Sequence, residues 1–388
     1  MKDTYISEAV KYIGADDTTL DLFESQYQIP NGVSYNSYVI LDEKVAVMDT
    51  IDERKTDEWL ANLENVLNGR MVDYLVISHL EPDHAANIKR AADKFPQAQL
   101  VLSAKAKAML PQFFDIAHLD ERCLVVKEGD TLELGIHKLH FVMAPMVHWP
   151  EVMVEYEETE KILFSADGFG KFGALSAEEE WTDEARRYFI NIVGKYGVQV
   201  QTLLKKAAAL DIQTICPLHG PVLKENLGFY IGKYLTWSSY EPEEDGVLVA
   251  CASIHGNTKA AAEKMVEVLR ANGASKVVFM DLTRDDMAEA VADAFRYGKI
   301  ILAAASYDAG VFPPMEDFLH RLVHKNLQKR TFGLIENGSW APCAAKGMKG
   351  ILEGMKEVNV CENVVSIKST MKDTDVAKME ELAKEILA

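Results

Sequence analysis

YLVISHLEPDH, residues 74–84, decides the fold of the first half of the chain. Tyr74–Ser78 form an apolar run typical of a buried strand, and the polar residues after it belong to the loop at that strand's carboxyl end. The loop carries two imidazoles and two carboxylates, which are metal-ligating groups within reach of one another: His79, Glu81, Asp83 and His84.

Three more potential ligands follow predicted strands later in the chain, namely His148, Asp167 and His219. We expect all of these side chains to meet at one edge of a sheet. A single His or Asp is more often a core or solvated residue, and a helix cap would explain Asp83 or His84 alone. Neither explanation covers the whole set, so the sequence predicts a metal site.

A site with four imidazoles, three carboxylates and no thiolate suits iron, manganese or zinc. Two metal ions that share a carboxylate lie about 3.5–4 Å apart. Asp167 is the best candidate for the shared ligand, because the other six divide into two sets of three. Our geometric hypothesis is that His79, Glu81 and His148 form one set, and Asp83, His84 and His219 the other.

The rest of residues 1–241 mixes strands with helices, which predicts an αββα sandwich. Expected strands are Tyr38–Leu41, Val45–Met48, Tyr74–Ile77, Leu100–Ser103, Leu139–Met143, Ile162–Phe164 and Thr214–Cys216. Expected helices are Lys55–Leu67, Ala85–Lys94 and Glu184–Ala209.

An acidic stretch with Pro and Gly at its edges, Glu241–Gly246, is interpreted as a linker between domains 1–241 and 247–388. Beyond it, strands and helices alternate, which predicts a doubly wound parallel sheet of flavodoxin-like topology. Expected strands are Val247–Cys251, Val277–Met280, Ile300–Ala304, Phe332–Ile335 and Val364–Ile367. Expected helices are Thr258–Leu269, Asp285–Tyr297, Met315–His324, Ala345–Val358 and Thr374–Leu387.

A strand-to-helix turn at residues 253–258 offers hydroxyl, amide and backbone donors at a helix N-terminus. It lacks the Gly-Lys-Ser/Thr of a nucleotide P-loop and any GxGxxG, so a monophosphate fits best. Two further strand ends, 305–310 and 337–342, point at the same edge, where Tyr307 and Trp340 can flank a flat aromatic ring. Capping residues and surface aromatics are the plainer interpretation of each loop taken alone.

Composition excludes several classes of protein. The 388 residues carry 41 Lys+Arg against 60 Asp+Glu, a net charge of −19, which argues against nucleic-acid binding as the main activity. No signal peptide is expected at Met1–Tyr5, and no apolar run is long enough for a membrane span. The 5 cysteines form no CxxC pair, which predicts free thiols in the cytoplasm and no rubredoxin-type or iron–sulfur centre in this chain.

Over essentially its whole length the sequence resembles the flavodiiron proteins, also called A-type flavoproteins. The zinc hydrolases of the same fold have His where Glu81 stands in His79–His84, and the Glu is the mark of this family. Asn31–Tyr38 and Pro217–Pro221 also resemble its segments. The resemblance implies a metallo-β-lactamase-like domain with a non-haem diiron site, followed by a flavodoxin-like domain that binds FMN.

By position, the resemblance implies that His79, Glu81 and His148 bind one iron, that Asp83, His84 and His219 bind the other, and that Asp167 bridges them. His84 is displaced from the metal in some relatives. Tyr196 resembles a tyrosine near the irons. The implied FMN contacts are Ser253, Ile254, His255, Gly256, Asn257, Thr258, Ala305, Ser306, Tyr307, Asp308, Ala309, Gly310, Gly338, Ser339, Trp340 and Ala341. The third flavin loop departs from the glycine-rich form of relatives.

Members of this family in anaerobes reduce O2 to water, NO to N2O, or both, with electrons relayed by FMN to the irons. The resemblance also implies an external electron donor, rubredoxin or a deazaflavin, and a head-to-tail homodimer or a dimer of dimers. Two alternatives stay open: a hydrolase of the metallo-β-lactamase fold with an appended flavodoxin domain, and an electron carrier whose metal domain is vestigial.

Overall fold

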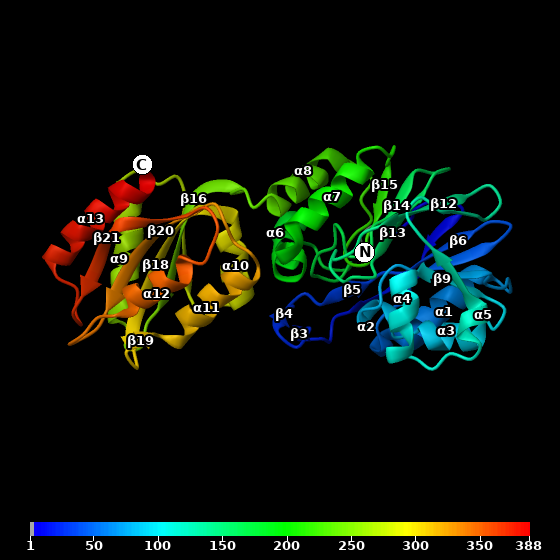
Figure 1. Ribbon diagram of the computed structural model, residues 1–388, viewed down its shortest axis with the longest axis horizontal. Coiled ribbons are helices and arrows are strands. Elements are labelled where there is room, and N and C mark those ends of the chain that lie inside the picture. Colours follow the sequence, from blue (N-terminus) through cyan, green and yellow to red (C-terminus); the bar gives the residue numbers. More distant parts are fainter. Residues whose placement is uncertain (1–3) are drawn as a thin grey trace. The chain divides into compact units, whose positions relative to one another are not determined.

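The computed structural model describes residues 4–388, and its contacts divide the chain into two compact units (Figure 1). The first comprises Met1–Phe189 with Val198–Leu235, and the second Ile190–Gly197 with Thr236–Ala388. The domain boundary at residues 242–246 stays a prediction.

Two sheets face each other in the first unit. A six-stranded sheet has the order β1-β6-β7-β8-β9-β10, and a five-stranded sheet has the order β11-β12-β13-β14-β15. Their strands are β1 (Val10–Tyr12), β6 (Tyr38–Leu41), β7 (Val45–Met48), β8 (Tyr74–Ile77), β9 (Gln99–Ser103), β10 (Cys123–Val126), β11 (Thr131–Glu133), β12 (Lys138–Met143), β13 (Met153–Glu157), β14 (Ile162–Phe164) and β15 (Thr214–Cys216). Short pairs join β2 (Ala15–Asp17) to β5 (Val33–Tyr35) and β3 (Leu22–Phe23) to β4 (Tyr27–Gln28).

Alternation along the strands builds three apolar layers. Phe141, Met153 and Phe164 point between the sheets, into a core that they share with Met48 and Val76 of the other sheet. The alternate residues point outward and pack against helices. The helices of this unit are α1 (Thr56–Leu67), α2 (Pro82–Ala85), α3 (Ile88–Lys94), α4 (Ala104–Met109), α5 (Leu119–Arg122), α6 (Trp181–Tyr188), α7 (Gly197–Ala207) and α8 (Leu227–Ser238).

Two long helices predicted for this unit are interrupted. The stretch predicted as Ala85–Lys94 is split at Asn87, whose side-chain amide donates to the Ile51 carbonyl. The stretch predicted as Glu184–Ala209 contains a π-turn at Phe189–Val193 and a 3-10 turn at Gly194–Tyr196. Gly197 follows, where a Cβ would meet the Ser238 carbonyl oxygen at 2.3 Å.

The second unit is a parallel sheet of order β17-β16-β18-β20-β21, the 2-1-3-4-5 order of flavodoxin-like folds. Its elements are β16 (Glu244–Ala252), α9 (Asn257–Ala271), β17 (Val277–Asp281), α10 (Met287–Arg296), β18 (Tyr297–Tyr307), β19 (Gly310–Val311), α11 (Pro313–His324), β20 (Arg330–Asn337), α12 (Ala344–Leu352), β21 (Val358–Ile367) and α13 (Asp373–Leu387). Helices α9 and α13 contact each other, and α10, α11 and α12 form a second group (Figure 1).

Two predictions for this unit need correction. The acidic stretch is a linker only in part, because β16 begins at Glu244, whose carboxylate lies 2.6 Å from the Arg296 guanidinium and 3.0 Å from the Lys276 ammonium. The helix predicted as Ala345–Val358 ends at Leu352, because Val358 already pairs with Arg330 in the sheet.

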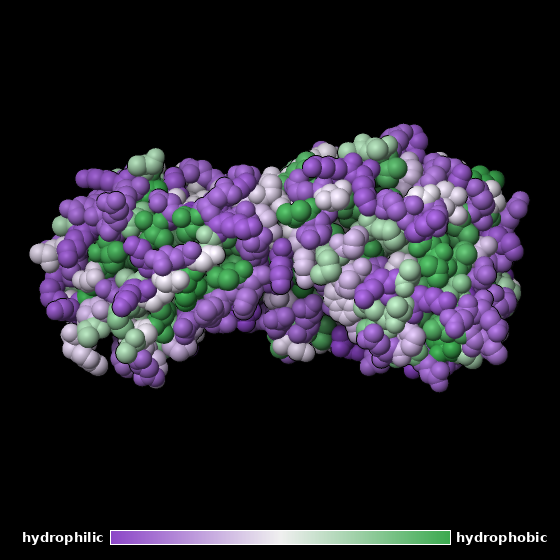
Figure 2. Space-filling model, viewed as in Figure 1, coloured by the Kyte–Doolittle hydropathy of each residue, from purple (hydrophilic) through white to green (hydrophobic). Residues whose placement is uncertain are grey.

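The surface in view is mostly hydrophilic, with apolar residues scattered among charged ones (Figure 2). None of the helices in the described residues 4–388 is both long and apolar enough to cross a membrane.

Candidate functional site

The predicted metal ligands converge in two groups. His79, Glu81, His148 and Asp167 form one group, and Asp83, His84 and His219 form the other. Within each group, one ligand atom per residue lies within 4.8 Å of all the others. All of these side chains except Glu81 are buried, and His79, His84 and His219 are fully inaccessible.

Strand ends of both sheets supply these residues. His79 and Glu81 follow β8 of the six-stranded sheet, and α2 carries Asp83 and His84. The turns after β12, β14 and β15 of the five-stranded sheet carry His148, Asp167 and His219 respectively. The expectation of a single sheet edge is therefore wrong: the ligands meet where the strand ends of two facing sheets come together.

Asp167 lies between the two groups. Its Oδ2 is 3.3 Å from the Nε2 atoms of both His79 and His148. Its Oδ1 is 3.2 Å from Nε2 of His84 and 3.8 Å from Nε2 of His219. Each carboxylate oxygen thus faces a different group, which is the arrangement that a bridging ligand requires.

The remaining carboxylates complete each group. Oε2 of Glu81 lies 2.9 Å from Nε2 of His148 and 3.3 Å from Nε2 of His79. Oδ2 of Asp83 lies 3.3 Å from Nε2 of His84 and 3.2 Å from Nε2 of His219. The Nε2 atoms of His84 and His219 are themselves only 3.1 Å apart. Imidazole nitrogens from several directions share one small space with carboxylates.

The donor set fits metal ions better than it fits a hydrogen-bonded cluster. Both carboxylate oxygens of Asp83 and of Asp167 are buried without a hydrogen bond. Buried polar atoms without partners are rare and costly, and metal coordination is one of the few arrangements that explains them.

The pKa shifts in the site also show that its carboxylates favour positive charge beside them. Burial raises the pKa of the Asp167 carboxyl, but His84, His148 and His79 outweigh burial and hold that pKa well below its usual range. Burial lowers the pKa of the His148 imidazole, but the neighbouring carboxylates of Asp167 and Glu81 outweigh burial and raise that pKa to about 9. The carboxylates of the site therefore stabilise cations, whether protons or metal ions.

A layer of further contacts orients two of the imidazoles. Nδ1 of His79 lies 2.8 Å from the carboxylate of Glu151, which also accepts the Leu80 amide at 2.9 Å. Nδ1 of His219 donates to the Ser34 carbonyl at 2.7 Å. Both contacts fix the ring so that Nε2 faces the site. Sequence reasoning missed Glu151 and Ser34, because neither lies in a ligand motif.

The structure brings Tyr188 and Tyr35 close to a ligand, His219, and Tyr188 is the nearer of the two. Its ring centroid lies 5.4 Å from that of His219, and burial, with Asp167, Asp83 and Glu81, raises its pKa well above the usual value. Tyr196 belongs to the second unit, half-buried in the turn at Gly194–Tyr196, and its role near the metals stays a prediction.

A cavity of about 590 Å³ lies at the carboxyl ends of the strands in the second unit. The predicted loops line most of it, with Ser253, Ile254, His255, Asn257, Thr258, Ala305, Ser306, Tyr307, Asp308, Ala309, Gly338, Ser339, Trp340 and Ala341. The predicted Gly256 and Gly310 are not among the lining residues; Gly256 caps α9 with a φ of 94°. Asn337, Cys343 and Ser369 line it as well.

Ser369 reveals a fourth loop, after β21, that sequence reasoning missed. Its backbone amide donates to the Asn337 side chain at 3.0 Å, and its hydroxyl lies 2.8 Å from that of Ser339. Ser306 also has a structural task, because its hydroxyl accepts the Cys343 and Ala344 amides at the start of α12.

The cavity suits a phosphorylated flat ring. Its phosphate end is the start of α9, where Ser253 and Thr258 offer hydroxyls and the helix dipole favours an anion. Trp340 and Tyr307 are exposed large side chains beside the cavity, available to contact a ring.

Comparisons with known proteins agree with both halves of the structure. Residues 33–220 match the family described as ODP family beta lactamase. The nitric oxide reductase of Moorella thermoacetica is 26% identical, over 99% of this chain and 98% of that protein.

Two solved structures resemble the whole chain. The rubredoxin oxygen:oxidoreductase from the anaerobe Desulfovibrio gigas is 25% identical with a TM-score of 0.91, covering 99% of this chain and 97% of that chain. The flavodiiron protein from Giardia intestinalis is 24% identical with a TM-score of 0.90, covering 100% of this chain and 97% of that chain, which supports the fold. The predicted fold class, a metallo-β-lactamase-like part followed by a flavodoxin-like part, is confirmed.

Proposed function

We propose that this chain, which is similar along its whole length to a nitric oxide reductase and to a rubredoxin oxygen:oxidoreductase, is a flavodiiron protein, an oxidoreductase that reduces O2 to water, NO to N2O, or both. Its cofactors are a non-haem diiron centre and FMN. The observation that carries the proposal is Asp167, whose two oxygens face two separate groups of imidazoles and carboxylates.

In this proposal His79, Glu81 and His148 hold one iron, Asp83, His84 and His219 hold the other, and Asp167 bridges them. The iron pair and FMN together supply the electrons that reduce the gas. The protein's own contribution is to hold the imidazoles in place: the Glu151 carboxylate fixes the ring of His79, and the Ser34 carbonyl fixes that of His219.

His84 differs from these two imidazoles. Its Nε2 faces Asp167, but its Nδ1 is buried without a hydrogen bond. No neighbour therefore fixes its ring, and we propose that it is the least constrained ligand of the centre.

In the second unit, residues 253–258 hold the FMN phosphate through the Ser253 and Thr258 hydroxyls and the α9 amides. The loops at 305–310 and 337–343 surround the ribityl chain and the ring, with Tyr307 and Trp340 beside it. Ser369 adds a contact from the fourth loop.

The partners extend the proposal beyond the site. We propose that a separate carrier, rubredoxin or a deazaflavin, reduces the flavin, and the name of a similar protein, the rubredoxin-oxygen oxidoreductase of Megalodesulfovibrio gigas, supports this. A head-to-tail homodimer, or a dimer of such dimers, and a cytoplasmic location complete the proposal.

A hydrolase of the metallo-β-lactamase fold is the alternative, and Glu81 disfavours it. Its carboxylate lies against both His79 and His148, at a position where the zinc hydrolases of this fold have His. The carboxylate is a harder ligand than the imidazole it replaces, and it suits iron.

The test combines metal analysis with gas uptake. Purified full-length protein, supplied with iron and FMN and reduced chemically, should contain about two irons and one flavin per chain and consume O2 or NO. Zinc in place of iron, with hydrolysis and no gas uptake, would instead establish the alternative. Loaded protein with iron and flavin that consumes neither gas would leave only an electron carrier.

A further inference from the structure

An apolar cavity lies directly behind the turn that carries Asp167. It is enclosed between the outer face of the five-stranded sheet, which contributes Val154 and Leu163, and helix α7, which contributes Val200 and Leu204. Its volume is about 30 Å³. The whole lining belongs to the first unit.

The apolar lining of this cavity is not suited to bind a water molecule. The two polar side chains in its lining are engaged with the backbone: the Ser165 hydroxyl donates to the Gly168 carbonyl at 2.6 Å, and the Tyr234 hydroxyl accepts the Phe169 amide. A buried water needs two to four polar partners, and apolar cavities without them stay dry and bind apolar guests such as xenon.

Residues that lie close in the chain to two of the metal ligands line this cavity. Ser165 and Gly168 line it and belong to the short turn that holds Asp167. Val147 lines it as well and immediately precedes His148. A molecule in the cavity thus contacts the turn that carries the proposed bridging carboxylate and the residue that precedes one imidazole.

We propose that this cavity binds the diatomic gas and supplies it to the metal site, an inference that rests on the proposed function. O2 and NO are small and apolar, and both dissolve better in an apolar enclosure than in water. The enclosure holds little more than one such molecule. It therefore raises the local concentration of gas beside the centre and excludes water there.

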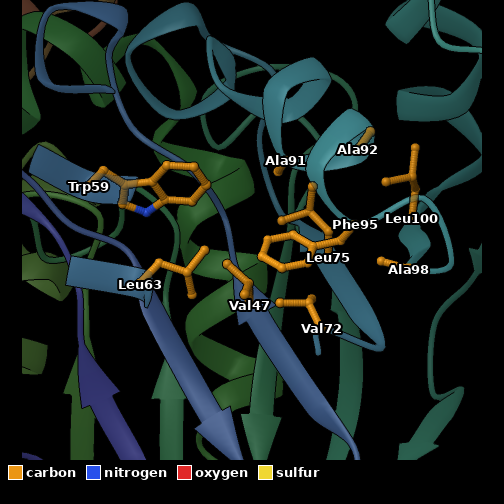
Figure 3. A pocket seen from close by; sticks show the side chains of 10 residues that line it. All are labelled: Val47, Trp59, Leu63, Val72, Leu75, Ala91, Ala92, Phe95, Ala98 and Leu100. Carbon is orange, nitrogen blue, oxygen red and sulfur yellow. The ribbon is translucent and has the colours of Figure 1, made fainter. Parts of the chain in front are cut away.

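A second cavity in the same unit provides the matched control. It lies on the other side of the sandwich, between the outer face of the six-stranded sheet and helices α1 and α3, with a volume of about 10 Å³ (Figure 3). Its lining is equally apolar, with Trp59, Leu63 and Phe95, but none of its lining residues is a metal ligand or the neighbour of one. The two cavities share an apolar lining, but they differ in volume and in the distance of their lining residues from the ligands along the chain.

The first experiment is a crystal structure of the loaded full-length protein under xenon pressure. We expect xenon in the cavity that Val200 lines. A cavity that stays empty under xenon overturns the proposal.

The second experiment fills the cavity and measures gas uptake. Val200→Phe should raise the KM for the gas about tenfold and leave kcat at saturating gas within about twofold, because supply is impaired and chemistry is not. Val200→Leu is a milder filling variant and should shift KM in the same direction. Ala92→Leu fills the control cavity and should leave both constants unchanged. Iron and flavin contents, measured for each variant, should equal those of the parent protein.

The outcomes separate this inference from the proposed function. Normal KM in both Val200 variants, in a protein that reduces the gas, overturns the cavity as a supply site and leaves the function standing. A different result is loaded protein that binds xenon in the cavity but consumes neither gas. That result overturns the proposed function, and it also overturns the proposal that the cavity binds O2 or NO. A tenfold KM effect that Ala92→Leu reproduces also overturns the proposal.

Discussion

The two cofactor sites of this chain are built on opposite plans. The metal site consists of side chains that are buried and mutually aligned, with His79, His84 and His219 at 0% exposure. The flavin cavity is an open space of about 590 Å³ among loops, beside which Trp340 is 88% exposed.

The difference predicts how much a single side chain contributes to cofactor binding at each site. In the metal site, removal of one ligand leaves other buried charges uncompensated, so single side chains should dominate. In the flavin cavity, backbone amides and several loops share the contacts, so single side chains should contribute modestly. Each prediction below tests one side of this contrast.

The largest effect should follow from removal of the shared carboxylate. Asp167→Ala deprives both groups of imidazoles of their common ligand, and we expect gas consumption to fall by at least about 100-fold, because loss of a residue that only orients a ligand already costs up to about that much. Flavin should stay bound. Oxygen and nitric oxide electrodes measure the uptake, and absorbance and metal analysis measure the cofactors.

Asp93→Ala is the matched control for that variant. Asp93 also carries a carboxylate in the first unit, but it is exposed and pairs only with Lys89, four residues earlier on α3. Its removal should leave uptake unchanged. Normal turnover of Asp167→Ala would disprove the bridging role.

A smaller loss of gas consumption is expected for Glu151, which contacts a metal ligand but is not itself one. Glu151→Gln keeps the shape of the side chain that holds Nδ1 of His79 but removes its charge, and such changes reduce metal affinity or activity about 10–100-fold. Uptake should be measured at rising iron concentrations, because an affinity defect is partly restored by excess metal.

The control for Glu151→Gln is Glu160→Gln. The Glu160 carboxylate also faces an imidazole, at 3.4 Å from Nε2 of His137, outside the metal site. Equal losses in both variants would mean that the effect arises from general stability and not from ligand orientation.

In the flavin cavity, a double substitution should have a moderate effect. Ser253→Ala with Thr258→Ala removes two hydroxyls from the phosphate end, and we expect FMN to bind about tenfold more weakly, close to the lower limit for loss of one hydrogen bond to a charged group, because the backbone amides there are kept. Iron content should stay unchanged. Fluorescence titration of the flavin-free protein measures the affinity.

Ser275→Ala serves as its control, because Ser275 lies at the amino end of β17 and bonds to Asp245. Loss of iron together with flavin in the double variant would contradict the separation of the two sites.

The metal site could be predicted from sequence because its information lies in the side chains. An Asp, Glu or His can be recognised directly in the sequence, and the predicted strand before it places it at the end of a sheet. The contacts behind the ligands were missed for the same reason. Ser34 acts through its backbone carbonyl, and Glu151 stands between Pro150 and Val152, where no ligand motif marks it.

The flavin cavity was predicted less completely because it is made of turns. Ser369 resembles any polar residue after a strand, and only the pairing of β20 with β21 brings it to Asn337. Ser306 was expected to contact the flavin, but it caps α12 as well, because the loop places its hydroxyl at two unpaired amides. Helix breaks such as the π-turn at Phe189–Val193 depend on packing and leave no periodic signal.

The smallest effect concerns a histidine–carboxylate pair that resembles His79 and Glu151 but binds no predicted metal. Nδ1 of His137 lies 2.8 Å from the Asp42 carboxylate. Burial lowers the pKa of the imidazole, but the bonds to Asp42 and Glu160 outweigh burial and raise that pKa above its usual value. The protonated imidazole therefore stabilises the fold below the pKa that it has when unfolded, and this contribution is lost as the pH rises through the raised folded value.

His137→Gln should accordingly destabilise the protein more in mildly acidic than in alkaline buffer, by less than about 1 kcal/mol because the pair is partly screened by solvent. Urea unfolding of parent and variant at both pH values measures the difference. The metal-site histidines are the same in both proteins, so their contribution cancels when the variant is compared with its parent. A difference in unfolding free energy that does not change with pH would show that the imidazole is neutral in the fold, and that its bonds to Asp42 and Glu160 do not favour the charged form.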